Sequence, residues 1–280
     1  LYHYSPLLHA LERRAAIAED LWSRLTRGLP EGSLLLGLTS IHWRESWKYG
    51  ERAYRYCQHD VGHAIAALTY AAAAQGWHVR LLEAVGDEEV GRLLGVSGQH
   101  GPEREHPDCL LALSTVGRES LDEISESWRP EPSVLDDLDE AVLDGRPNQL
   151  SREHHSWPVI DEVAEACTKP PGASHVENTT SNSFDSTSII KPRPESARVI
   201  FRQRRSAVDM DGQTWLDTAS FLRMLSAIVP VAGRPPLAAL PWASAIELLV
   251  FVHRVKELEP GLYALVRNPS HELTMREAMD

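Results

Sequence analysis

The chain has 280 residues, 42% apolar and 24% charged, which is an ordinary balance for a globular protein. Its 28 Lys and Arg residues against 40 Asp and Glu give a net charge of −12, which argues against a protein that tracks nucleic-acid phosphates. The three cysteines show no C-x-x-C spacing, so we expect no disulfide framework and a cytoplasmic location. The longest apolar run, residues 64–74, is too short for a membrane span, so we expect no membrane partner.

Apolar spacing and turn residues predict the elements in chain order. The expected helices cover residues 6–25, 51–75, 88–94, part of 122–144, and 215–228. The expected strands cover residues 2–4, 33–43, 79–85, 110–116 and 248–255, with a further strand from residue 261. Residues 197–201 fit either a strand or the approach to a helix. Residues 151–195 are predicted to be a linker or flexible loop, because their second half is rich in Pro, Ser, Thr and Asn.

Three clusters could carry chemistry. The first is Arg-Gln-Arg-Arg-Ser at residues 202–206, where guanidinium groups and a hydroxyl suit phosphate oxygens. The bland alternative is a basic segment that pairs with surface carboxylates. The second is the aromatic and cationic stretch at residues 43–56. There, a Lys48 desolvated by aromatic neighbours would have a lowered pKa and could share a proton with Tyr49. The alternative is a cation–π and salt-bridge network that only fixes the start of a helix.

The third cluster is His59 and His63, four residues apart on an expected helix, in a pattern similar to the H-E-x-x-H zinc motif. The acid here is Asp60 rather than Glu, and no clear third ligand follows. A zinc hydrolase is therefore the weaker interpretation. The stronger one is a helix whose histidines hydrogen-bond to neighbouring groups.

Several segments together resemble the nitroreductase-like flavoproteins, and specifically the SagB-type dehydrogenases that include thiazoline and oxazoline oxidases. They are W-K-Y-G-E-R-A-Y-R-Y at residues 47–56, G-H-A at 62–64, R-Q-R-R-S at 202–206 and F-V-H-R-V-K-E-L-E-P-G-L-Y at 251–263. A domain of that family runs R-R-S, P-G-L-Y, K-Y-G, whereas K-Y-G comes first here. A short similarity between the two ends of the chain agrees with this order. The chain thus resembles the central piece of a tandem protein, with residues 1–150 a back half and 196–280 a front half.

The resemblance implies an α+β fold, with a mainly antiparallel sheet flanked by helices, built as two halves or as a permuted single domain. It implies FMN as cofactor, with Arg204, Arg205 and Ser206 binding the phosphate and ribityl chain. Lys48 and Tyr49 inherit the catalytic assignment. Gly86 would lie beside the reactive edge of the flavin.

Two features depart from the family pattern. Val208 stands where a cation is usual, and the flavin-contacting P-S-S-G-N segment is absent. The expected function is hydride transfer between flavin and a small-molecule or peptide-derived substrate, with Lys48 and Tyr49 handling the proton. The alternative is a non-catalytic or degenerate flavin-binding or scaffold half. The resemblance also implies pairing, either as a homo-oligomer or between tandem halves.

Overall fold

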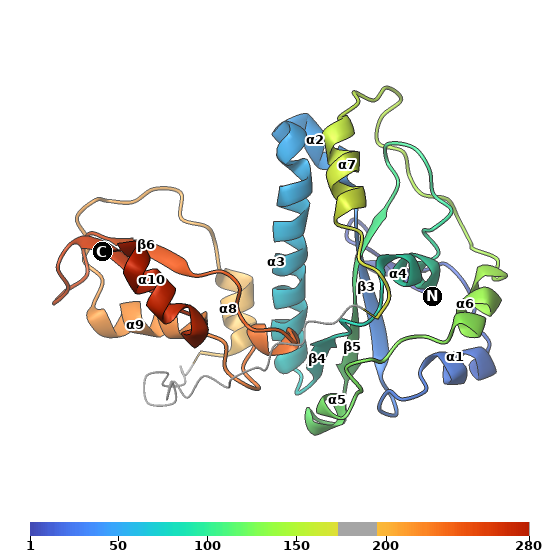
Figure 1. The fold of residues 1–280 in the computed structure, drawn as a ribbon, viewed down its shortest axis with the longest axis horizontal. Coiled ribbons are helices and arrows are strands. Elements are labelled where there is room, and N and C mark those ends of the chain that lie inside the picture. The colour runs from blue at the N-terminus through green and yellow to red at the C-terminus, as the bar shows by residue number, and fades with distance from the viewer. Residues whose placement is uncertain (173–194, 280) are drawn as a thin grey trace. The chain divides into compact units, whose positions relative to one another are not determined.

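The computed structural model describes residues 1–172 and 195–279 (Figure 1). The chain divides into two compact units, Leu1–His175 and Val176–Asp280, and each is described by itself below. Both units mix helices with small antiparallel sheets, so the predicted α+β class is confirmed.

The first unit is built on a three-stranded antiparallel sheet with the order β3-β5-β4. Its strands are β3 (Leu34–Ser40), β4 (His78–Leu81) and β5 (His106–Ser114). The central strand β5 is buried continuously from residue 110 to 114, because it has strand neighbours at both edges and helices near both faces. Leu110 and Ala112 belong to the main core, while α3 (Ala53–Ala73) runs alongside the sheet and contacts β3 and β4 (Figure 1).

The remaining helices of this unit surround the sheet. They are α1 (Glu19–Leu25), α2 (His42–Tyr49), the short η1 (Gly50–Arg52), α4 (Asp87–Leu94), α5 (Glu119–Asp122), α6 (Pro132–Asp139) and α7 (Pro158–Ala166). The main core joins one face of β5 to α1, α4, α6 and the loop after α5. It consists of Leu25, Leu82, Val85, Val90, Leu93, Leu110, Ala112, Leu121, Ile124, Trp128, Val134, Leu135 and Leu138.

The second unit contains a two-stranded antiparallel sheet, β6 (Leu248–Val252) with β7 (Gly261–Leu265). Its helices are α8 (Ala197–Gln203), α9 (Thr218–Ala227), η3 (Leu237–Ala239), η4 (Pro269–His271) and α10 (Glu272–Met279). The predicted helix at 215–228 and the predicted strands at 248–255 and from 261 are confirmed. Residues 197–201 are helical.

The predicted helix at 6–25 is wrong over most of its length. Residues 2–13 form a β-hairpin instead, in which β1 (Tyr2–Ser5) pairs with β2 (Ala10–Arg13), and only α1 is helical. Pro6 lies in the turn between the two strands. Leu8 and Leu11, which suggested a helical apolar face, are exposed rather than packed in a core.

Two other expectations need correction. The strand predicted at 33–43 ends at Ser40. The stretch that follows folds as α2 and η1, so residues 43–56 are themselves helical rather than a connection between a strand and a helix. The linker predicted at 151–195 contains α7, which begins at Pro158, a favoured first helical residue, and packs against α3. Residues 173–194 of that segment lie outside the described part of the chain.

Candidate functional site

Lys48 and Tyr49 form an aromatic and cationic cluster at the end of α2, in which Lys48 is exposed and the tyrosines are half-buried. The Tyr49 ring stacks on the ring of Tyr56 from α3, with centroids 3.9 Å apart and planes 17° from parallel. The Lys48 Nζ lies 5.0 Å from the Tyr49 ring centroid, a cation–π distance. Gly50, with a positive φ of 58°, turns the chain between α2 and η1 and so brings the two tyrosines together. We call Lys48, Tyr49 and Tyr56 the Lys–Tyr cluster.

The expected lowering of the Lys48 pKa is wrong. A hydrogen bond with Tyr49 and the nearby tyrosine oxygen raise the pKa of Lys48, and they outweigh a minor effect of burial. The side chain is exposed, so desolvation has little to act on. Lys48 therefore carries its proton at neutral pH and offers a charged donor rather than a base.

Gly86 is buried at the start of α4, where the chain covers it with its own backbone. Its N–H donates to Glu89 Oε2 at 2.9 Å, and a Cβ built on it would lie 2.6 Å from the backbone nitrogen of Pro171. The neighbouring Asp87 N–H donates to the carbonyl oxygen of Lys169 at 3.0 Å. In this arrangement Gly86 has neither a free N–H nor open space for a flavin, so it does not fit the predicted contact.

Arg204, Arg205 and Ser206 follow α8 in the second unit, whereas Lys48, Tyr49 and Gly86 belong to the first. All three side chains are exposed. The Arg205 Nη1 donates to the carbonyl oxygens of Arg202 and Arg204 at 3.0 and 2.7 Å, which steadies the loop. Exposed guanidinium groups beside a hydroxyl fit a phosphate group, so these residues remain suited to the tail of FMN.

His59 and His63 lie exposed on α3, and the nearest carboxylate contact joins His63 Nδ1 to Asp60 Oδ1 at 3.6 Å. Within residues 1–172 and 195–279, no group of three or more His, Cys, Asp or Glu side chains is placed to hold a metal ion. The donor set therefore does not fit the zinc alternative.

The first unit also contains a cavity of about 520 Å³, which we call the histidine cavity. Its walls come from α2, α3, α4, the loop before β5, β5 itself and the end of α7. The lining residues are His42, Tyr54, Gln58, Asp87, Glu88, Gly91, Val96, Ser97, Gln99, His100, Arg104, Glu105, His106, Pro107, Asp108, Ala164, Cys167, Thr168 and Lys169. This volume lies within the usual range of small-molecule sites.

His42 is the most unusual residue in this wall. It is 3% exposed, and both of its ring nitrogens are buried with no hydrogen-bond partner. The ring stacks on His106, with centroids 4.2 Å apart, and meets Tyr54 edge-on at 5.0 Å. Burial, followed by the charge of His106 and Arg104, lowers the pKa of His42 to about 4, so the imidazole is neutral at pH 7.

Two carboxylates of the cavity are also perturbed. Burial raises the pKa of Asp108 to about 6, although Ser40 Oγ at 2.7 Å and Gln58 Nε2 at 3.3 Å both donate to it. Burial likewise raises the pKa of Asp87, which accepts a hydrogen bond from the Lys169 N–H at 2.9 Å. Buried carboxylates with raised pKa values in a cavity are typical of functional sites.

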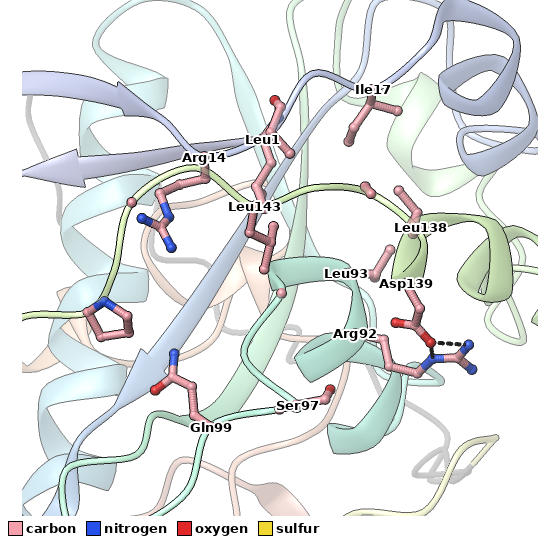
Figure 2. Close-up of a pocket in the computed structure, with 16 residues that line it drawn as sticks. Leu1, Arg14, Ile17, Arg92, Leu93, Ser97, Gln99, Leu138, Asp139 and Leu143 are labelled. Carbon is pink, nitrogen blue, oxygen red and sulfur yellow. Dashed lines mark hydrogen bonds and ion pairs between the residues drawn. The ribbon is translucent and has the colours of Figure 1, made fainter.

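A second cavity of about 360 Å³ opens beside the N-terminal segment (Figure 2). Two of its charged groups are paired, since Arg92 donates to Asp139 at 2.8 Å, and Arg92 also donates to Asp136 at 2.7 Å, while Arg14 lines the same cavity. Leucine side chains and backbone make up much of the remaining wall. This cavity therefore offers less chemistry than the histidine cavity.

The sequence reading missed His42 and Asp108. One local signal could have found part of the cavity: His106 and Asp108 are polar residues at the start of a strand that becomes apolar at Leu110. No motif spacing links His42 to this strand.

Among the described residues, no helix is both long and apolar enough to span a bilayer. Comparison of the chain with protein-family models, with curated proteins and with solved structures finds no match in any of the three.

Proposed function

We propose that this chain is a nitroreductase-like protein that contributes to an FMN-dependent oxidoreductase of the SagB type. The sequence resemblance supports the proposal, and the structural observation that carries it furthest is the partly exposed Lys–Tyr cluster. Tyr49 stacked on Tyr56, with a protonated lysine above the ring, offers a flat surface and a positive charge to a planar, anionic partner.

The chain's own residues would divide the task as follows. Arg204, Arg205 and Ser206 would hold the phosphate through charge-assisted hydrogen bonds. Lys48 would hold its proton at Nζ and supply positive charge, with Tyr49 as its hydrogen-bond partner. When bound, FMN would supply hydride transfer to or from a small-molecule or peptide-derived substrate. Because these groups lie in separate units, pairing of tandem halves or of two copies would complete the site.

A second candidate is a degenerate flavin-binding or scaffold half. Two observations favour it: Pro170 and Pro171 cover Gly86, and Val208, which replaces the usual cation, is fully exposed. Such a half would keep the fold and its binding surfaces but would catalyse no reaction.

Titration of the purified chain with FMN, followed by quenching of flavin fluorescence, tests the proposal. We expect saturable binding, with flavin retained on desalting. The double variant Arg204→Gln/Arg205→Gln should weaken binding about tenfold or more, because each charge-assisted hydrogen bond is worth more than 1 kcal/mol. Arg152→Gln, an exposed arginine of the first unit, is the matched control and should bind like the wild type.

The outcomes separate the two candidates. Bound FMN that is reduced by NADH or NADPH and reoxidised by an added acceptor supports the oxidoreductase. Bound FMN without turnover supports the scaffold half. Absence of FMN binding would contradict both.

A further inference from the structure

We propose that the histidine cavity binds a small planar organic cation, such as an aromatic amidine, through the carboxylates of Asp108 and Asp87 and the aromatic wall of His42, His106 and Tyr54. This site is independent of FMN binding, since it uses none of the residues assigned to the flavin. Three features of the cavity lead to this class of ligand.

The first feature is a surplus of carboxylate acceptors over available cations. Arg104 lines the cavity, but its Nη2 donates to Asp161 at 2.8 Å. The Lys169 ammonium donates to the carbonyl oxygens of Glu83 and Val85, and its charge acts on Asp87 without forming an ion pair. Among the ion pairs of the described residues, none involves Asp87 or Asp108. A ligand that brings its own positive charge would therefore find two partners here, whereas an anionic ligand would meet repulsion.

The second feature is that Asp108 is held by neutral donors alone. Ser40 Oγ donates to one of its oxygens and Gln58 Nε2 to the other, which fixes the carboxylate and leaves a lone pair on each oxygen. The raised pKa of Asp108 agrees with burial that no cation compensates. A planar amidinium presents parallel N–H donors that match such a carboxylate.

The third feature is the aromatic part of the cavity wall. His42 stacks on His106, and Tyr54 meets the His42 ring edge-on, so three aromatic rings gather in one part of the cavity wall. More than nine-tenths of His42 is buried, yet both of its ring nitrogens lack a hydrogen-bond partner. Buried polar groups in native proteins are normally satisfied, so such a residue in a cavity wall points to a missing partner. A ring rotation about χ2 would turn a nitrogen toward a bound ligand.

The direct test uses p-aminobenzamidine, whose fluorescence rises in an apolar environment, as the probe. We expect saturable binding to the full chain at pH 7.5 and none by p-aminobenzoate, which has a similar shape and the opposite charge. The variant Asp108→Asn should weaken probe binding about tenfold or more, because it removes a charge-assisted hydrogen bond. Asp87→Asn should weaken it in the same direction.

Asp20→Asn removes an exposed carboxylate from α1 and is the matched control, which should leave binding unchanged. Circular dichroism of each variant establishes that the fold is retained. Non-saturable binding of the probe, equal binding of p-aminobenzoate, or wild-type affinity in Asp108→Asn would each overturn the proposal. A failure to bind FMN would leave it untouched, because the probe reports on different residues.

Discussion

The two units of this chain contain similar apolar strands but bury them to different extents. In the first unit, β5 is continuously buried from residue 110 to 114, and Leu111 is 0% exposed. In the second unit, β6 is just as apolar, yet Leu249 is 53% and Phe251 73% exposed. The difference lies in the neighbours, because β5 has a strand at each edge and helices near its faces, whereas within residues 195–279 the only strand paired with β6 is β7.

This contrast shows that an apolar run predicts a strand but not the depth at which the strand lies. The first unit closes a core of its own around β5. Among the described residues of the second unit, the buried apolar side chains are limited to Val229, Ala239, Val252 and Val255. Its exposed apolar side chains would suit a covering partner, which agrees with the proposed pairing of halves or copies.

The largest effect is expected from replacing one leucine by alanine within each of the two strands, β5 and β6. Leu111→Ala should destabilise the first unit by about 3 to 4 kcal/mol, because it removes a fully buried side chain and leaves a cavity. Leu249→Ala should cost less than about 1 kcal/mol, because half of that side chain is already in water. Urea denaturation followed by circular dichroism measures both values. Equal losses would show that the second unit buries β6 against a partner in solution.

Glu103 in the first unit and Glu247 in the second are both largely buried carboxylates that gather several donors, and comparing them predicts the next effect. Glu103, 10% exposed, accepts hydrogen bonds from the Leu150 and Ser151 N–H groups and pairs with Arg44 and His154. Glu247, 9% exposed, accepts from the Arg267 and Asn268 N–H groups and pairs with His271. The first carboxylate is thus paired with the permanently charged guanidinium of Arg44 as well as with a histidine.

Glu103→Gln should cost about 2 kcal/mol and Glu247→Gln about 1 kcal/mol, since each leaves buried donors without a charged acceptor. The hydrogen bonds outweigh burial and lower the pKa of Glu103 to about 2, from 4.5. Its contribution is therefore complete above about pH 4.5 and disappears as the pH falls toward 2. Unfolding free energies measured from pH 7 to 3 check this, and a Glu103→Gln penalty that stays constant with pH would contradict it.

The sequence predicted the elements whose pattern is local. The helix at 51–75 and the strands around β3 and β5 could be recognised because apolar spacing, β-branched or leucine-rich runs and a stop at Gly76 lie within each segment. The helix predicted at 6–25 failed because Leu8 and Leu11 have helical spacing but no core to face. Whether an apolar residue is buried depends on elements far along the chain.

The same limit applies to the candidate sites. The Lys–Tyr cluster was partly predictable, since Lys48 and Tyr49 are adjacent and Tyr56 follows closely. The histidine cavity was not, because its walls come from α2, the start of β5 and the residues after α7, which meet only in the folded unit. The covering of Gly86 by Pro170 and Pro171 is equally non-local, because these prolines lie more than 80 residues further along the chain.

The smallest effect is expected at Asp108, whose pKa shift is opposite in direction to that of Asp211. Burial raises the pKa of Asp108 to about 6, whereas hydrogen bonds from Thr214 and the Gln213 N–H lower the pKa of the exposed Asp211 to about 2. Because the folded pKa of Asp108 lies above its unfolded value of 3.8, wild-type stability falls as the pH rises from about 4 through 6. Asp108→Asn removes this penalty and should stabilise the first unit by about 1 to 2 kcal/mol at pH 7, with no gain below pH 4. Carboxyl ¹³C NMR titration and urea denaturation at pH 4 and pH 7 measure these effects. An Asp108 midpoint near pH 4, or equal stability of variant and wild type at pH 7, would contradict the prediction. Either result would show that the Asp108 carboxylate is as well solvated as a carboxylate on the protein surface.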